Sequence, residues 1–167
     1  EGEILSRFTW KGNEFNVRTV CHPAQDMISA HIDSHLHTGI KFHFPYPTGI
    51  HTDNACDWDA NDKHSTEVLK QDTQSAVLKR TLDSTVYYVE LKWEGKALLK
   101  EKEKNYFVLL PQEDTFSFSC AFTVNEPDQL AALPNFSEVE SLAKNHWASV
   151  WEKGAAVDFS HCTDPRA

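Results

Sequence analysis

The side chains best suited to chemistry lie in one acidic stretch around a tryptophan, which contains His51, Asp57, Trp58 and Asp59. An aromatic ring can stack on the face of a sugar, while carboxylate and imidazole groups hydrogen-bond to hydroxyls. We therefore predict that these residues contact substrate. Glycoside hydrolysis needs two carboxylates that flank the sugar. No pair is distinguished from the acidic surface, and Asp57 and Asp59 are the only candidates. The pattern is too weak to assign a catalytic residue.

The same stretch partly resembles a calcium loop. Positions 1, 3 and 5 of an EF-hand loop are filled by Asp57, Asp59 and Asn61. Position 6 should be glycine and is Asp62, and position 12 should be glutamate and is Val68. The EF-hand interpretation therefore fails. A looser calcium site that includes Asp53 remains an alternative to a solvated acidic turn.

Other reactive side chains do not form a known motif. His35 and His37 have a spacing found in zinc sites, but no third ligand can be identified. No Cys-x-x-C, G-x-S-x-G or glycine-rich phosphate motif occurs. Cys120 is in phase with Phe118 and Phe122, which predicts a buried free thiol. We predict no bound metal and no cofactor.

The elements that position these residues are mostly strands. Apolar side chains alternate with others in many short segments, which is typical of antiparallel strands with one buried face. Short turns separate many of them, so the pattern predicts a mainly β, antiparallel β-sandwich. The strongest alternation covers residues 15–19, 28–32, 40–46, 87–93 and 116–122, with weaker strands at 5–10, 66–71, 76–82, 97–101 and 106–110.

A single amphipathic helix follows the strands. Ser137 is predicted as its N-cap, with Glu140 completing a capping box, and Gly154 as its C′ glycine. Trp147 and Trp151 form an i, i+4 pair that we interpret as a docking surface for the sandwich or a following domain. The predicted organisation is a sandwich domain at 1–135, a linker helix at 136–154 and a connecting segment at 155–167.

Charge and composition exclude several partners. The net charge of −9 disfavours nucleic acid and anionic membrane surfaces. No run of about 18 apolar residues predicts a transmembrane helix, and no signal-peptide pattern opens the chain at Glu1.

Three segments together resemble a known family: residues 17–32, the Phe-Pro-Tyr-Pro-Thr-Gly run at 44–49, and the Trp-x-x-x-Trp to Asp-Phe-Ser tail at 146–160. They are similar to the N-terminal β-supersandwich, a galactose-mutarotase-like fold, of glycoside hydrolases related to families 65 and 95. The resemblance implies carbohydrate processing by a bacterial, periplasmic or secreted protein. It also implies that a C-terminal (α/α)6-barrel, absent here, carries catalysis. Residues 155–167 would begin the connection to it.

Three functions follow as alternatives. The first is a non-catalytic N-terminal domain that packs on the barrel and contributes the loop at 49–63 to a site for an oligosaccharide. The second is a self-sufficient carbohydrate-binding module. The third is a structural or metal-stabilised interaction domain.

Overall fold

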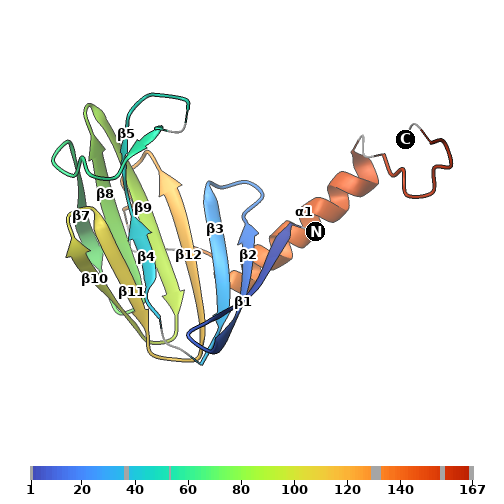
Figure 1. The fold of residues 1–167 in the computed structure, drawn as a ribbon, viewed down its shortest axis with the longest axis horizontal. Helices are drawn as coiled ribbons and strands as arrows, with labels where there is room; N and C mark the ends of the chain where they lie inside the picture. Colours follow the sequence, from blue (N-terminus) through green and yellow to red (C-terminus); the bar gives the residue numbers. More distant parts are fainter. Residues whose placement is uncertain (1, 36–37, 53, 129–132, 155–156, 166–167) are drawn as a thin grey trace.

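A computed structural model describes residues 2–35, 38–52, 54–128, 133–154 and 157–165. The protein is mainly β, with antiparallel sheets and one C-terminal helix (Figure 1), so the predicted fold class is confirmed. The elements are β1 (Glu3–Trp10), β2 (Asn13–Cys21), β3 (Met27–Asp33), β4 (Ile40–His43), β5 (Tyr46–Pro47), β6 (Cys56–Asp57), β7 (His64–Gln71), β8 (Ser75–Leu82), β9 (Thr85–Glu94), β10 (Ala97–Glu103), β11 (Tyr106–Pro111), β12 (Thr115–Thr123) and α1 (Phe136–Lys153).

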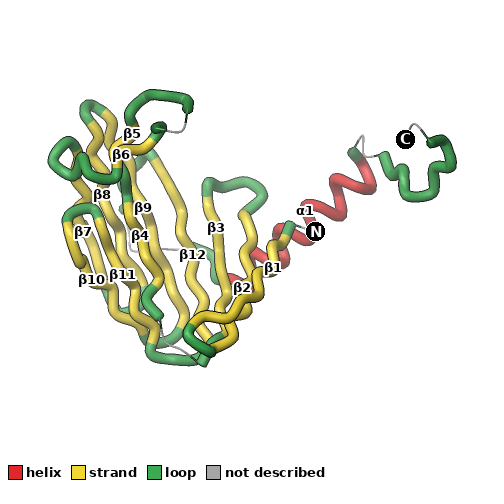
Figure 2. The backbone as a smooth tube through the Cα atoms, in the orientation of Figure 1, coloured by secondary structure: helices red, strands yellow, loops and turns green. Residues whose placement is uncertain are grey.

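Two sheets of unequal width form the layers. The large sheet has seven strands in the order β1-β2-β3-β12-β9-β8-β7, and the small sheet has the order β10-β11-β4. A short β5-β6 hairpin sits apart at one end (Figure 2). Because the small sheet has fewer strands, it covers only part of one face of the large sheet.

The main core lies between the two sheets. Alternate residues of β8, β9 and β12 point toward the small sheet, as the period of two in their sequences dictates. Trp93 is 2% exposed and its indole N–H donates to the Thr73 carbonyl at 3.1 Å. The buried members of this cluster are Ala76, Leu78, Val89, Leu91, Trp93, Leu99, Phe107, Leu109, Phe116 and Cys120. Cys120 is buried and free, as the sequence predicted.

The opposite face of the large sheet carries α1. Phe136 and Val139 of α1 pack with Val20, Met27 and Ala121 in a second apolar cluster. Described residues on either side of 129–132 are held by lysines of β7 and β9. The Nζ atoms of Lys70 and Lys92 donate to the carbonyls of Pro127 and Leu133, each at 2.6 Å.

The N-cap of the helix lies two residues earlier than the sequence predicted, at Asn135 instead of Ser137. Asn135 is the N-cap, and its side chain accepts from the Glu138 backbone while Glu138 accepts from the Asn135 backbone. The capping box at Ser137 and Glu140 was therefore wrong, because Asn135 offers the same geometry and leaves Glu140 for Arg18. Gly154 is the C-cap, with an extended backbone (φ −83°) rather than the left-handed conformation expected of C′ glycine. No described helix combines the length and apolarity needed to span a bilayer.

Turns and bulges shape the sheet edges. Lys11 and Gly12, both at positive φ, connect β1 to β2 in a tight turn. The pairing of β7 with β8 shifts register between Val68 and Lys70, and that of β10 with β11 shifts between Glu101 and Glu103. β4 ends at His43 rather than continuing to residue 46, because Pro45 has no N–H to donate.

Candidate functional site

The acidic stretch forms an ordered turn at one end of the sandwich. The β5-β6 hairpin pairs Tyr46 with Asp57, and Asp57 then closes the next turn. Its Oδ1 accepts from the backbone N–H groups of Asp59 at 3.0 Å and Ala60 at 3.2 Å. The Asp57 carboxylate therefore stabilises the turn by accepting backbone hydrogen bonds. Ala60, at the end of this turn, is buried, with 6% of its surface exposed.

Trp58 presents a half-exposed ring beside two other aromatic rings. Its ring centroid lies 4.7 Å from that of His43, which in turn lies 5.1 Å from that of Tyr106. His43 and Tyr106 are paired across β4 and β11, so the row of rings is fixed by the small sheet. Trp58 is 50% exposed, which leaves part of its ring surface open to a ligand.

The other predicted site residues are placed around this ring less closely. Asp59 and His51 are exposed in the same loop. Within the described residues, no hydrogen bond or ring contact joins His51 to Trp58. The structure therefore brings Asp57, Trp58 and Asp59 into one turn, and no contact among the described residues links His51 to that turn. Asp53, the further residue of the calcium alternative, lies outside the described residues.

A buried polar cluster beneath the loop was missed by the sequence reading. Arg80 is 1% exposed, and its NH1 group lies 2.7 Å from His64 Nδ1 and donates to Thr66 Oγ1 at 2.8 Å. Asn105 is 0% exposed, and its amide donates to the side-chain oxygen of Asn61 at 3.3 Å. The cluster therefore ties the loop to the large sheet. The sequence feature that could have revealed the cluster is the position of Arg80, which is in phase with the buried residues of β8.

Electrostatics in this cluster favour a neutral histidine. Burial lowers the pKa of His64 below its usual value, and the positive charge of Arg80 lowers it further. A neutral imidazole keeps Nδ1 available as an acceptor for Arg80. The guanidinium also faces the ring of Phe44, with Cζ 4.9 Å from the ring centroid.

Metal-binding geometry is not formed by the described side chains. Among residues 2–35, 38–52, 54–128, 133–154 and 157–165, no three His, Cys, Asp or Glu groups converge on one point. His35 instead lies against Asp114, with Nδ1 2.9 Å from a carboxylate oxygen. His37, its partner in the zinc hypothesis, lies outside the described residues.

The two tryptophans of the predicted docking surface occur in the second half of α1. Trp147 is 41% exposed and Trp151 is 48% exposed. The backbone of Gly2 lies against Trp147, so a Cβ at Gly2 would stand 2.3 Å from Trp147 Cδ1. The first half of α1 is tied to the sheet by an ion cluster in which Arg18 of β2 contacts Glu3 and Glu140.

Comparisons with known proteins add no relative. No protein-family model matches the chain, and a search of curated proteins finds no similar sequence.

Proposed function

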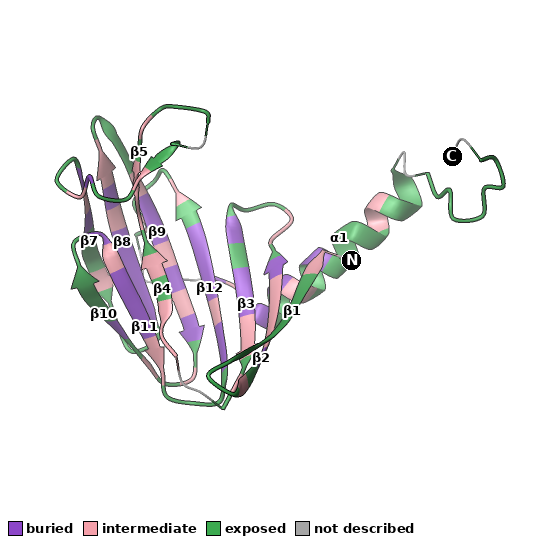
Figure 3. Ribbon diagram, viewed as in Figure 1, coloured by how far each residue is buried: buried purple, intermediate pink, exposed green. Residues whose placement is uncertain are grey.

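We propose that the chain is a non-catalytic β-sandwich domain of a carbohydrate-active enzyme, and that it packs on a catalytic (α/α)6-barrel of the same protein. The observation that carries the proposal is the uneven burial of α1. Phe136, Val139 and Ala143 are buried against the sheet, whereas Trp147 on the continuing stripe is 41% exposed. Figure 3 shows the second half of the helix, largely exposed, projecting beyond the sheet.

A projecting amphipathic helix favours a second folded neighbour. Water contact on a large indole is costly, at about 25 cal/mol for each Å² of apolar surface. A partner domain that covers the end of the helix removes that cost and fixes the angle between the domains. The resemblance to supersandwich domains supports the barrel as this neighbour, in a periplasmic or secreted enzyme.

The loop at 49–63 is proposed to reach the sugar site of the barrel. Trp58 would provide a stacking surface, and Asp59 and His51 would provide hydrogen-bonding groups. Asp57 would act indirectly, because its carboxylate already holds the turn beside Trp58.

The docking proposal is tested by comparing the isolated chain with the full natural protein. Trp147→Lys should lower the melting temperature of the full protein by several degrees more than that of the isolated chain. Asn145→Lys, at an exposed neighbouring position, should lower neither. Equal effects of Trp147→Lys in both proteins would contradict docking through the helix.

A catalytic assay addresses the non-catalytic role. The isolated chain should not turn over aryl glycosides or α-linked oligosaccharides, because the resemblance implies that the catalytic carboxylates lie in the barrel. Robust turnover by the purified chain would overturn the proposal, provided that the activity elutes together with the chain from a size-exclusion column.

A stand-alone carbohydrate-binding module is the second candidate, favoured by the half-exposed ring of Trp58. It predicts measurable heat of binding when the isolated chain is titrated against a glycan panel. Trp58→Ala should weaken that binding by about two- to tenfold, since stacking contributes about 0.5–1.5 kcal/mol. Ile50→Ala, in the same loop and also 50% exposed, should leave it unchanged.

A further inference from the structure

The inner face of the large sheet is incompletely covered over β1, β2 and β3, although Phe15 and Ala30 on this face are each 5% exposed. Phe8 and Trp10 are 49% and 46% exposed, whereas Val89 and Leu91 on the same face of β9 are 0% and 1% exposed. The small sheet produces this difference, because it covers the β8-β9-β12 part of the face only. Ile28 of β3 is also exposed, at 39%. Apolar surface of this kind marks an interaction site.

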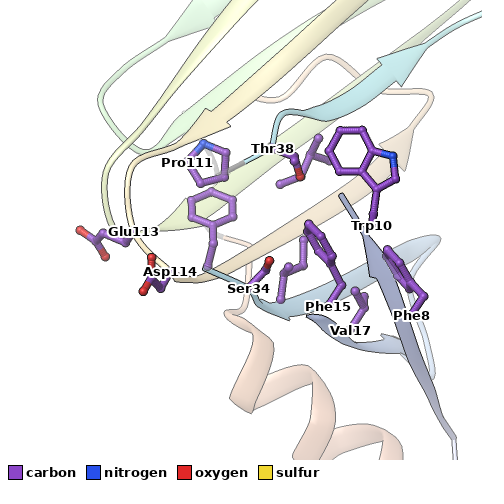
Figure 4. A pocket seen from close by; sticks show the side chains of 12 residues that line it. Phe8, Trp10, Phe15, Val17, Ser34, Thr38, Pro111, Glu113 and Asp114 are labelled. Carbon is purple, nitrogen blue, oxygen red and sulfur yellow. The ribbon is translucent and has the colours of Figure 1, made fainter. Parts of the chain in front are cut away.

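A cavity of about 180 Å³ lies where this face meets the beginning of β4 (Figure 4). Phe8 and Phe15 stack inside it with ring centroids 5.1 Å apart. The apolar lining consists of Phe8, Trp10, Phe15, Val17, Ile32, Ile40, Pro111 and Phe116.

A strand edge borders the same region. β4 is the edge strand of the small sheet, and in the part of the chain that the structure describes it pairs only with β11. Its inward side chains Ile40 and Phe42 remain partly exposed, although Phe107 and Leu109 of β11 are 0% exposed. The core between the sheets is therefore open on the β4 side. An edge strand presents unpaired N–H and C=O groups that can pair with another extended chain.

Charge at the cavity indicates which extended chain would fit. Among the residues that line it, the charged ones are Glu113 and Asp114, and both are acidic. A basic side chain at one end of the incoming segment would complement them. A second copy of this chain fits less well, because each copy carries a net charge of −9.

We propose that this site binds an extended peptide segment of a partner protein, which adds to β4 as a fourth strand of the small sheet. Alternate apolar side chains of the segment cover Phe8, Trp10 and Ile32. A lysine or arginine at its end lies beside Glu113 and Asp114. Backbone pairing with β4 supplies affinity, and the aromatic cavity supplies specificity, as in other strand additions. This interaction is independent of docking through α1.

Selection from a displayed library of random eight-residue peptides tests the proposal. The wild-type chain should enrich peptides in which apolar residues alternate and a basic residue stands at one end. Phe8→Asp should weaken binding of the enriched peptides by at least tenfold. Leu5→Asp is the matched control, because Leu5 is 63% exposed on the other face of the same strand. Circular dichroism and melting curves establish whether both variants are folded. If Phe8→Asp is not folded, Trp10→Ser replaces it in the same binding test.

Hydrogen exchange distinguishes strand addition from simple apolar contact. An enriched synthetic peptide should slow amide exchange within β4, residues 40–43, by tenfold or more. Failure to enrich any peptide, equal binding by Phe8→Asp, or unchanged exchange in β4 would each overturn the proposal. Light scattering that shows a dimer abolished by Phe8→Asp would overturn it in favour of a second copy.

Discussion

Replacing Arg80 by methionine tests the buried polar cluster beneath the loop. Methionine retains the apolar length of the side chain but removes the charge and every hydrogen bond of the guanidinium. The contacts at risk are of two kinds. His64 Nδ1 and Thr66 Oγ1 lie at 2.7 and 2.8 Å, while Asn105 Oδ1, the Pro45 carbonyl and the Tyr87 hydroxyl lie at 3.3–3.4 Å.

The short contacts decide the magnitude. Each hydrogen bond made by a charged group contributes about 1.5–3 kcal/mol, so the two short bonds together contribute about 3–6 kcal/mol. Removing a buried cation also removes the cost of its desolvation, which offsets a few kcal/mol of the lost hydrogen-bond energy. Thr66 and Asn105 keep each other as partners at 2.9 Å, so His64 loses most. We expect a net loss of about 3 kcal/mol in the free energy of unfolding.

Urea unfolding at pH 7.5, followed by tryptophan fluorescence, measures this loss. Lys79→Met is the matched control, because Lys79 is the neighbouring residue of β8 on the outer face. It should change the free energy of unfolding by less than about 0.5 kcal/mol. If Arg80→Met were as stable as Lys79→Met, the reasoning that the cluster stabilises the loop end would be refuted.

Three further predictions concern pH, the helix and the buried thiol. Because the folded-state pKa of His64 lies below its unfolded value of 6.5, the unfolded chain takes up the proton first as pH falls. Stability should therefore decline below about pH 6.5. Lys104 and His43 also lower the pKa of His64, whereas Asp62 raises it. Burial raises the pKa of Glu90, so protonation of Glu90 stabilises the folded state as pH falls and opposes the decline. The difference in slope between wild type and His64→Gln, measured by urea unfolding, isolates His64, and equal slopes would contradict this assignment. Val139→Ala should lower the free energy of unfolding by about 2 kcal/mol, because it removes buried apolar surface and leaves a small cavity. The higher helix propensity of alanine offsets a small part of this loss. Leu142→Ala, at a 43% exposed position, should cost clearly less in the same assay, and equal costs would count against the packing described for α1. Burial raises the pKa of Cys120 to about 12, so iodoacetamide at pH 8 should spare it in the folded protein. Mass spectrometry should show modification of the exposed thiols at Cys21, Cys56 and Cys162, with Cys120 reacting only in urea.

The strands could be predicted from the sequence because period-two alternation is a local property. The alternation at 28–32 and 87–93 falls inside β3 and β9, and the weaker segments at 5–10 and 106–110 fall inside β1 and β11. What alternation does not specify is which sheet covers the apolar face. The inner faces of β1 and β9 look alike in sequence, yet Phe8 is half-exposed and Val89 is buried.

The candidate site was predictable only where a residue type dominates its surroundings. Trp58 stood out as an aromatic ring between two carboxylates, and the structure places it half-exposed in an ordered turn. Its contact with His43 depends on pairing between β4 and the distant β11, which no local pattern reveals. Arg80 was missed because a cation on the inner face of a strand contradicts the simple pattern. The neutral acceptors that satisfy it come from several separate segments.

The register shifts in β7 and β10 bear on how copies of the protein behave at high concentration. These strands form the far edges of the large and the small sheet, and β10 also carries a run of lysines and glutamates. A bulged, charged edge is a poor template for another strand. Each sheet thus has one regular edge and one blunted edge. Growth of one continuous sheet through many copies needs both edges of that sheet, so strand pairing at the regular edge of either sheet would stop at two copies.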